Sequence, residues 1–220
     1  DVSVAKKYID AFYQFNKNRF FSNLVKDRAK SRLELGKLKR LFTKRTIFKD
    51  PIAIFSAEWF YKYQIVDNII LIRHPAAFVA SLKTKNWVHD FSHFAKQEDL
   101  LRDRLGTFKD EINEYASTDY DIIKQGILLW NIIYSQVSEY KKKYSDYWYF
   151  ARHEDLSLEP VLEFEKMFDF LDIEFTKDIR DGVIATTTSK DDGLIERNSV
   201  DNITSWKQRL SDSEIEEVRL

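Results

Sequence analysis

Cysteine is absent from the 220 residues, and glycine, proline and methionine are scarce, with five, three and one. Without cysteine the chain can form no disulfide, no thiolate metal site and no cysteine nucleophile. With only four histidines besides, we expect no metal site. None of the glycines lies in a GxxxxGK[ST] pattern, so this sequence contains no phosphate-cradling loop of that kind.

Basic and acidic residues nearly balance, at 35 and 36, which leaves a net charge of −1. This balance argues against nucleic acid as a partner, although it allows one small basic pocket. Hydrophobic residues make up 44% and aromatic residues 15%, so we expect one folded domain over residues 1–220. No apolar run is long enough to span a membrane, and the opening DVSVAKKY is unlike a signal peptide. We therefore expect a cytoplasmic protein.

The segment NIILIRHPAAFVAS, residues 68–81, combines a strand, a turn and a helix. The run Ile69–Ile72 predicts a strand of a parallel sheet that is buried on both faces. Arg73 ends that strand, and Pro75 favours the first position of a helix. Ligands bind beyond the carboxyl ends of such strands, and helix N-termini attract anions. We hypothesise that Arg73 and Ser81 form a phosphate site; the alternative is a surface arginine and a serine packed within a helix.

A second cation, Lys49, follows a short strand predicted at Thr46–Phe48. A fixed ammonium at a strand end stabilises the negative charge that develops during group transfer. The alternative is that Lys49 only neutralises the strand end, while Asp50 caps a helix predicted over Ile52–Gln64.

A third strand end occurs after the strand predicted at Tyr147–Arg152. His153 follows it, and an imidazole can stack on a purine base. The acidic pair Glu154 and Asp155 can be read as paired catalytic carboxylates. We interpret it instead as structural, fixing the loop and capping the helix that Pro160 opens.

Helical patterns fill most of the remaining chain. We expect a long buried helix to begin at Thr118, with Asp121 as a capping-box partner, and a stripe that includes Trp130 and Tyr134 to be core only. Ser211 and Glu214 form a second capping-box pattern before a last helix.

The motif IRHPAAFVAS, with Arg73, Pro75 and Ser81, resembles the 3′-phosphate-binding element of sulfotransferases, which use 3′-phosphoadenosine 5′-phosphosulfate (PAPS). Lys49-Asp50-Pro51 is similar to an element in the tyrosylprotein branch, whose lysine sits by the bridging oxygen of the leaving phosphate. The segment RHEDLSLEP resembles a third element, in which a tyrosine contacts adenine; His153 stands at that position here.

Two further motifs resemble the family's loop over the nucleotide phosphates. They are Arg197-Asn198-Ser199 and Ser205-Trp206-Lys207. The resemblance implies that Arg197 clamps the 3′-phosphate, because a bidentate guanidinium suits phosphate; the alternative is a solvated loop charge. It also places Ser199, Trp206 and Lys207 at the nucleotide, and Thr204 or Ser205 as hydrogen-bond donors to the transferring sulfuryl group.

The resemblance implies an α/β fold of the P-loop-kinase-like class, with three layers, a parallel sheet flanked by helices, and the first βα unit missing. It implies sulfuryl transfer from PAPS to the hydroxyl or amine of a small-molecule or glycan acceptor, without a metal, leaving adenosine 3′,5′-bisphosphate. The 5′-phosphosulfate loop and the general base are expected upstream of Asp1. We therefore expect the chain to be a truncated sulfotransferase domain that is inactive by itself.

Two alternatives stay open: a fragment of a P-loop small-molecule kinase, and a non-catalytic binding module. Trp87, His89 and His93 follow the first motif, and we interpret them as lining an acceptor cleft. The acceptor and the oligomeric state are not readable from these residues.

Overall fold

The structure is a computed structural model that describes residues 47, 49, 53–64, 66–188 and 198–219. The chain divides into two compact units, Asp1–Gln64 and Ile65–Leu220. The expectation of one domain over residues 1–220 stays a prediction.

The first unit contains the helix that was predicted to end at Gln64. A 3-10 turn, η1 (Ala53–Ser56), leads directly into α3 (Ala57–Gln64). Lys49 is exposed and lies in no regular element. Thr46 and Phe48, at the two ends of the predicted strand, lie outside the described residues.

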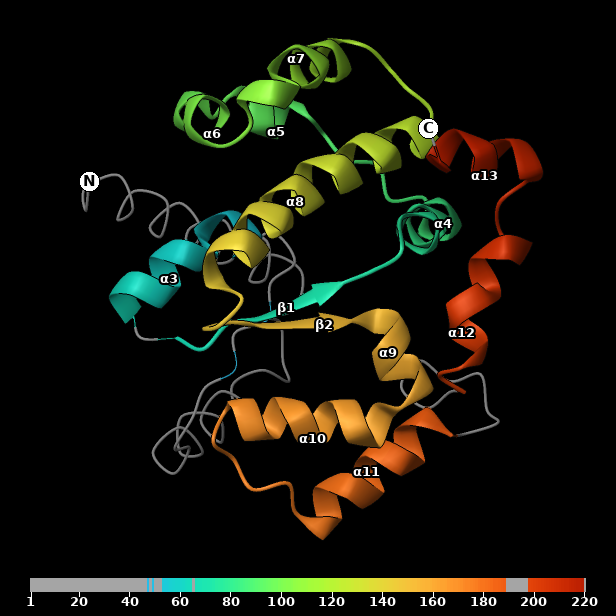
Figure 1. Ribbon diagram of the computed structural model, residues 1–220. Helices are drawn as coiled ribbons and strands as arrows, with labels where there is room; N and C mark the ends of the chain where they lie inside the picture. The colour runs from blue at the N-terminus through green and yellow to red at the C-terminus, as the bar shows by residue number, and fades with distance from the viewer. Residues whose placement is uncertain (1–46, 48, 50–52, 65, 189–197, 220) are drawn as a thin grey trace, which may run out of the picture. The chain divides into compact units, whose positions relative to one another are not determined.

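The second unit is built around two short parallel strands, β1 (Ile69–Ile72) and β2 (Tyr149–Arg152). Ile69 lies opposite Tyr149 and Ile72 opposite Arg152. In the part of the chain that the structure describes, these two strands form the sheet, and most other residues are helical (Figure 1). The fold is therefore broadly α/β and mostly helical, and the strand predicted from the run Ile69–Ile72 is confirmed.

Side chains of β2 alternate between two helical layers. The Tyr149 hydroxyl contacts α10 (Pro160–Phe170), donating to the Glu163 carboxylate at 3.3 Å. Phe150 points the other way and lies against Trp148, with ring centroids 6.4 Å apart; Trp148 packs on the end of α8 (Ile122–Tyr144). Because successive side chains of a strand point to opposite faces, β2 contacts helices on both of its faces.

The first strand is less covered than its sequence predicts. Ile70 is buried, whereas Leu71 is 50% exposed, so the predicted burial of β1 on both faces is wrong. The register puts Leu71 on the same face as Tyr149. On that face helix α10 packs mainly against β2 and covers β1 less, so Leu71 stays partly exposed.

Helix α8 begins later than predicted. Its first residue is Ile122, and the Asp121 carboxylate accepts hydrogen bonds from the N–H groups of Ile123 and Lys124, at 2.9 and 3.2 Å. Asp121 is thus the N-cap itself, and the predicted start at Thr118 is wrong because the carboxylate satisfies the first free amides of the helix four residues later.

Helix α4 (Pro75–Lys85) packs closely on α8, and Pro75 opens it as predicted. A Cβ added at Gly126 of α8 would lie 3.2 Å from Val79 Cγ2, so the absent side chain allows the approach. The core between the helices also includes Leu210 from the C-terminal segment. Through this shared core the C-terminal segment packs against the first turns of α4.

The remaining helices are short, and the last begins as predicted. The Ser211 N–H donates to Glu214 at 2.6 Å and the Glu214 N–H to the Ser211 hydroxyl at 3.3 Å, which confirms the capping box. These elements are α5 (Ser92–Ala95), α6 (Glu98–Asp103), η2 (Gly106–Phe108), α7 (Lys109–Ser117), α9 (His153–Leu158), α11 (Lys177–Thr187), α12 (Asp201–Thr204), η3 (Ser205–Gln208) and α13 (Asp212–Arg219).

Candidate functional site

Two of the sequence motifs meet where the parallel strands end. Because Ile72 pairs with Arg152, the residues that follow them, Arg73 and His153, leave the sheet side by side. The pKa of His153 is consistent with this proximity. Burial lowers it most, and the neighbouring Arg73 cation lowers it further. The structure therefore joins the Arg73 element to the His153 element at the carboxyl edge, where open α/β sheets bind ligands.

The Arg73 guanidinium has an unused donor. Its Nε atom is buried, and it has no hydrogen-bond partner among the described residues. Burial lowers the pKa of Arg73; Arg209 lowers it further, while Tyr134 and Glu154 raise it. A buried donor without an acceptor is costly unless a ligand satisfies it, and an anionic oxygen would form a charge-assisted bond there.

Two side chains of α8 hold the Arg73 backbone. The Arg73 N–H donates to the Tyr134 hydroxyl at 2.9 Å, and Trp130 Nε1–H donates to the Arg73 carbonyl at 3.0 Å. The two rings stack, with centroids 4.5 Å apart. The sequence interpretation of this stripe as core only missed this role. The residue types could have indicated this role, because the N–H of a buried tryptophan and the hydroxyl of a buried tyrosine usually form hydrogen bonds.

Glu154 ties the two strand ends together. Its Oε1 accepts from the His74 N–H at 3.0 Å, which supports the structural role predicted for it in this loop. The N-cap of α10 is Glu159, without a side-chain hydrogen bond, so the predicted capping of that helix by Glu154 and Asp155 is wrong. Both carboxylates instead lie in the first turn of α9, where negative charge suits the helix dipole.

The Ser199 motif lies against the His153 element. Ser157 Oγ donates to the His153 carbonyl at 2.8 Å, and Ser199 Oγ donates to the Ser157 carbonyl at 2.7 Å. Ser157 therefore links Ser199 to His153. The Ser199 hydroxyl itself is bonded to a backbone carbonyl. Arg197 lies outside the described residues.

The Trp206 motif also lies at the end of β1. The Trp206 ring stacks on His74, with centroids 5.1 Å apart, and Lys207 Nζ lies 5.6 Å from the Trp206 ring centre. Ser205 Oγ donates to the Asn202 carbonyl at 3.1 Å, and Thr204 is exposed. Trp206 is thus brought to the Arg73 element, while the roles expected of Thr204, Ser205 and Lys207 stay predictions.

Ser81 lies in α4, half-buried, and no hydrogen bond in the described part of the chain links it to Arg73. Lys49 belongs to the first unit and is exposed. The predictions that Ser81 binds the 3′-phosphate and that Lys49 lies at the leaving oxygen stay predictions.

His89 and His93 have the four-residue spacing seen in some metal sites. His89 lies against the rings of Phe91 and Phe94, and burial lowers its pKa. His93 is exposed and lies 3.5 Å from Asp90. Among the described residues, no group of three His, Cys, Asp or Glu side chains is arranged to hold a metal ion. Trp87 is 60% exposed, and its expected place in an acceptor cleft stays a prediction.

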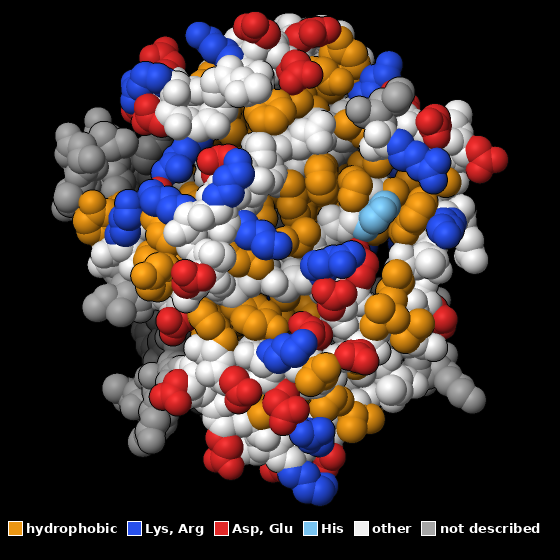
Figure 2. Space-filling model, viewed as in Figure 1, with side chains coloured by type: hydrophobic (Ala, Val, Ile, Leu, Met, Phe, Trp, Pro, Cys, Tyr) orange, Lys and Arg blue, Asp and Glu red, His pale blue; other side chains and the backbone are white. Residues whose placement is uncertain are grey.

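A further cation at the strand end, Arg209, was not singled out from the sequence. It follows η3, and its charge acts on Arg73. On the face shown in Figure 2, basic and acidic side chains are interspersed, with hydrophobic ones between them. This face therefore presents no broad field of one sign of charge.

No protein-family model, no curated protein and no solved structure matches the chain. No helix in the described ranges is long and apolar enough to cross a membrane. The carboxyl edge of the two strands thus carries a half-buried guanidinium, a neighbouring imidazole, and a stacked His74–Trp206 pair.

Proposed function

We propose that the protein is a PAPS-dependent sulfotransferase with a three-layer, P-loop-kinase-like fold, and that the carboxyl edge of β1 and β2 binds the 3′-phosphate and adenine of PAPS. The observation that carries the proposal is the buried Arg73 Nε, without a partner among the described residues, beside His153. A phosphate oxygen supplies the acceptor that this donor lacks.

Each expected residue has a stated part in this proposal. Arg73 and Ser81 bind the 3′-phosphate, and Arg197 clamps it. His153 stacks on adenine; burial and Arg73 keep its pKa below the ordinary value, which favours the neutral ring at pH 7. Ser199, Trp206 and Lys207 shape the closing segment. The His74–Trp206 stack supports this part, because it holds the segment at the end of β1.

The reaction is a direct group transfer. The acceptor oxygen forms a bond to sulfur while the bond between sulfur and the bridging oxygen of the 5′-phosphate breaks. The electrons of the broken bond stay on the phosphate, and the acceptor proton leaves to a base. Lys49 stabilises the leaving oxygen, and Thr204 or Ser205 donates to the sulfuryl oxygens. Such chemistry needs positioning and charge stabilisation more than covalent participation by the protein.

The test is calorimetric titration of the chain with adenosine 3′,5′-bisphosphate and, in parallel, adenosine 5′-phosphate. We expect the 3′-phosphate to strengthen binding, and Arg73→Gln to remove most of that gain, since a charge-assisted bond contributes about 1.5–3 kcal/mol. Arg219→Gln, on the exposed end of α13, is the matched control.

Other outcomes would contradict the proposal. Tighter binding of ATP with Mg²⁺ than of adenosine 3′,5′-bisphosphate would favour the kinase alternative. No nucleotide binding by a folded chain would favour the binding module, for which the absence of a GxxxxGK[ST] loop from the sequence is the supporting observation.

A further inference from the structure

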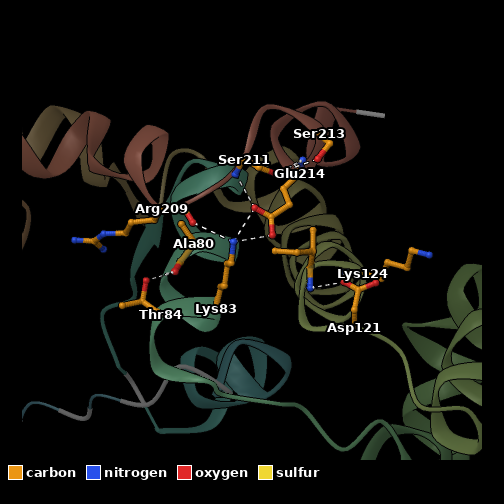
Figure 3. A network of polar contacts seen from close by, with 10 residues as sticks. Ala80, Lys83, Thr84, Asp121, Lys124, Arg209, Ser211, Ser213 and Glu214 are labelled. Atoms are coloured by element: carbon orange, nitrogen blue, oxygen red, sulfur yellow. Dashed lines mark hydrogen bonds and ion pairs between the residues drawn. The ribbon is translucent and has the colours of Figure 1, made fainter.

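One lysine of α4 makes several hydrogen bonds to the C-terminal segment. Lys83 Nζ donates to both Glu214 carboxylate oxygens at 2.7 Å and to the Arg209 carbonyl at 3.2 Å (Figure 3). The Ser211 N–H donates to the same carboxylate at 2.6 Å. These bonds, together with buried Leu210, fix the chain immediately after Arg209.

The chain before Arg209 is fixed as well. The Arg209 N–H donates to the Trp206 carbonyl at 3.1 Å, and Trp206 stacks on His74, the residue next to Arg73. The Arg209 side chain points away from the Lys83–Glu214 pair (Figure 3). Its side chain is exposed and makes no ion pair with any described residue. A backbone held on both sides thus presents a cation near the end of β1.

The charges around Arg73 are unbalanced. Arg209 acts on Arg73 as a like charge, which a folded protein tolerates at a cost. The carboxylate that acts on Arg73 is Glu154. Its Oε1 is already bonded to the His74 N–H, and its Oε2 lies 3.9 Å from Arg152. Two neighbouring guanidiniums attract an anion that carries two charges more strongly than one that carries a single charge.

We propose that Arg209 is a further ligand of the anion held by Arg73, and that together the two guanidiniums favour a phosphomonoester dianion. The proposal rests on the proposed function, and it adds a residue and a charge requirement to that site. Lys83 and Glu214 are positioning residues, because they hold the Arg209 backbone and not the anion.

The experiment compares two ligands by calorimetry: adenosine 3′,5′-bisphosphate and its analogue with a methyl ester on the 3′-phosphate, which carries one charge at that group. We expect the unaltered protein to prefer the free monoester about tenfold or more, as two charge-assisted contacts imply. Arg209→Gln should reduce this preference several-fold while retaining binding of the methyl ester. Arg209→Lys should restore part of it, and Arg219→Gln should leave it unchanged.

The outcomes separate this inference from the proposed function. If Arg209→Gln keeps the full preference while Arg73→Gln loses the 3′-phosphate gain, Arg209 is not a ligand and the sulfotransferase proposal stands. If neither variant changes nucleotide binding, both fail. If Arg209→Gln and Arg209→Lys weaken both ligands equally and lower the unfolding temperature, Arg209 is structural and the inference is overturned. Lys83→Met should also reduce the preference for the free monoester. If Lys83→Met has no such effect in a protein that already carries Arg209→Gln, Lys83 acts through Arg209, which supports its positioning role.

Discussion

The imidazole of His74 lies nearly parallel to the indole of Trp206, with ring centroids 5.1 Å apart and an interplanar angle of 12°. His74 follows the strand-end arginine, and Trp206 belongs to a segment far along the chain. His74 also uses its Nδ1 to accept from the Ala76 N–H at 3.2 Å, which fixes the ring as the N-cap of α4. The stack therefore connects the start of α4 to the C-terminal segment through a ring that cannot easily turn.

Replacing Trp206 with alanine should loosen this connection. We expect the free energy of unfolding to fall by about 1–3 kcal/mol, because a half-buried ring loses its apolar contacts and an aromatic pair. Trp206→Phe should keep most of the contact and lose less. Denaturant unfolding measures both, and Trp87→Ala, which removes an exposed indole, is the control. Equal stability of Trp206→Ala and the unaltered protein would contradict the structural role of the stack.

Removing the Tyr134 hydroxyl should leave the Arg73 N–H without its acceptor. Tyr134→Phe keeps the ring stacked on Trp130, so the expected loss of about 1–3 kcal/mol in unfolding free energy reports the unsatisfied amide. Binding of adenosine 3′,5′-bisphosphate should weaken with it, because the Arg73 backbone is less well held. The matched control is Tyr147→Phe, at a tyrosine that is 61% exposed. If both variants behave alike, the hydroxyl does not position Arg73.

The pKa of His153 should report the neighbouring guanidinium. Burial and the Arg73 cation lower it from 6.5, so Arg73→Gln should raise it. NMR titration of the imidazole signals measures the change, with exposed His93 as internal reference. In the folded state His153 binds its proton less readily than in the unfolded state, so its contribution to stability is complete above pH 6.5 and is lost as pH falls toward the lowered pKa. An unchanged His153 pKa in Arg73→Gln would mean that the two side chains do not interact.

Acid should release the C-terminal segment from α4. The hydrogen bonds from Lys83 and from the Ser211 N–H lower the pKa of Glu214 below 4.5. A lowered folded-state pKa means that this stabilisation is present above pH 4.5 and is lost as pH falls through the lowered value. Glu214→Gln should therefore cost about 1 kcal/mol at pH 7 and less at pH 3. Thermal unfolding at the two pH values checks this, and an equal loss at both would contradict the ionic part of the contact.

Local signals predicted several elements of this chain correctly. Pro75 opens α4, the run Ile69–Ile72 forms a strand, and Ser211 with Glu214 caps α13. Each depends on residues close in sequence, whose backbone preferences and side-chain reach settle the local conformation. The start of α8 was misjudged because two acceptors, Thr118 and Asp121, compete for the first turn, and their spacing alone does not show which one the helix uses.

The sequence by itself determined the balanced charge, the absence of cysteine, the strand–arginine–helix pattern around Arg73 and the caps, because these depend on composition and near neighbours. Only the tertiary structure decided which polar groups meet. The parallel register set Arg73 beside His153, two rings of α8 took the Arg73 backbone, and Lys83 fastened the chain after Arg209. These contacts join residues far apart in the chain, and they form because burying the shared core of α4, α8 and Leu210 brings the residues together.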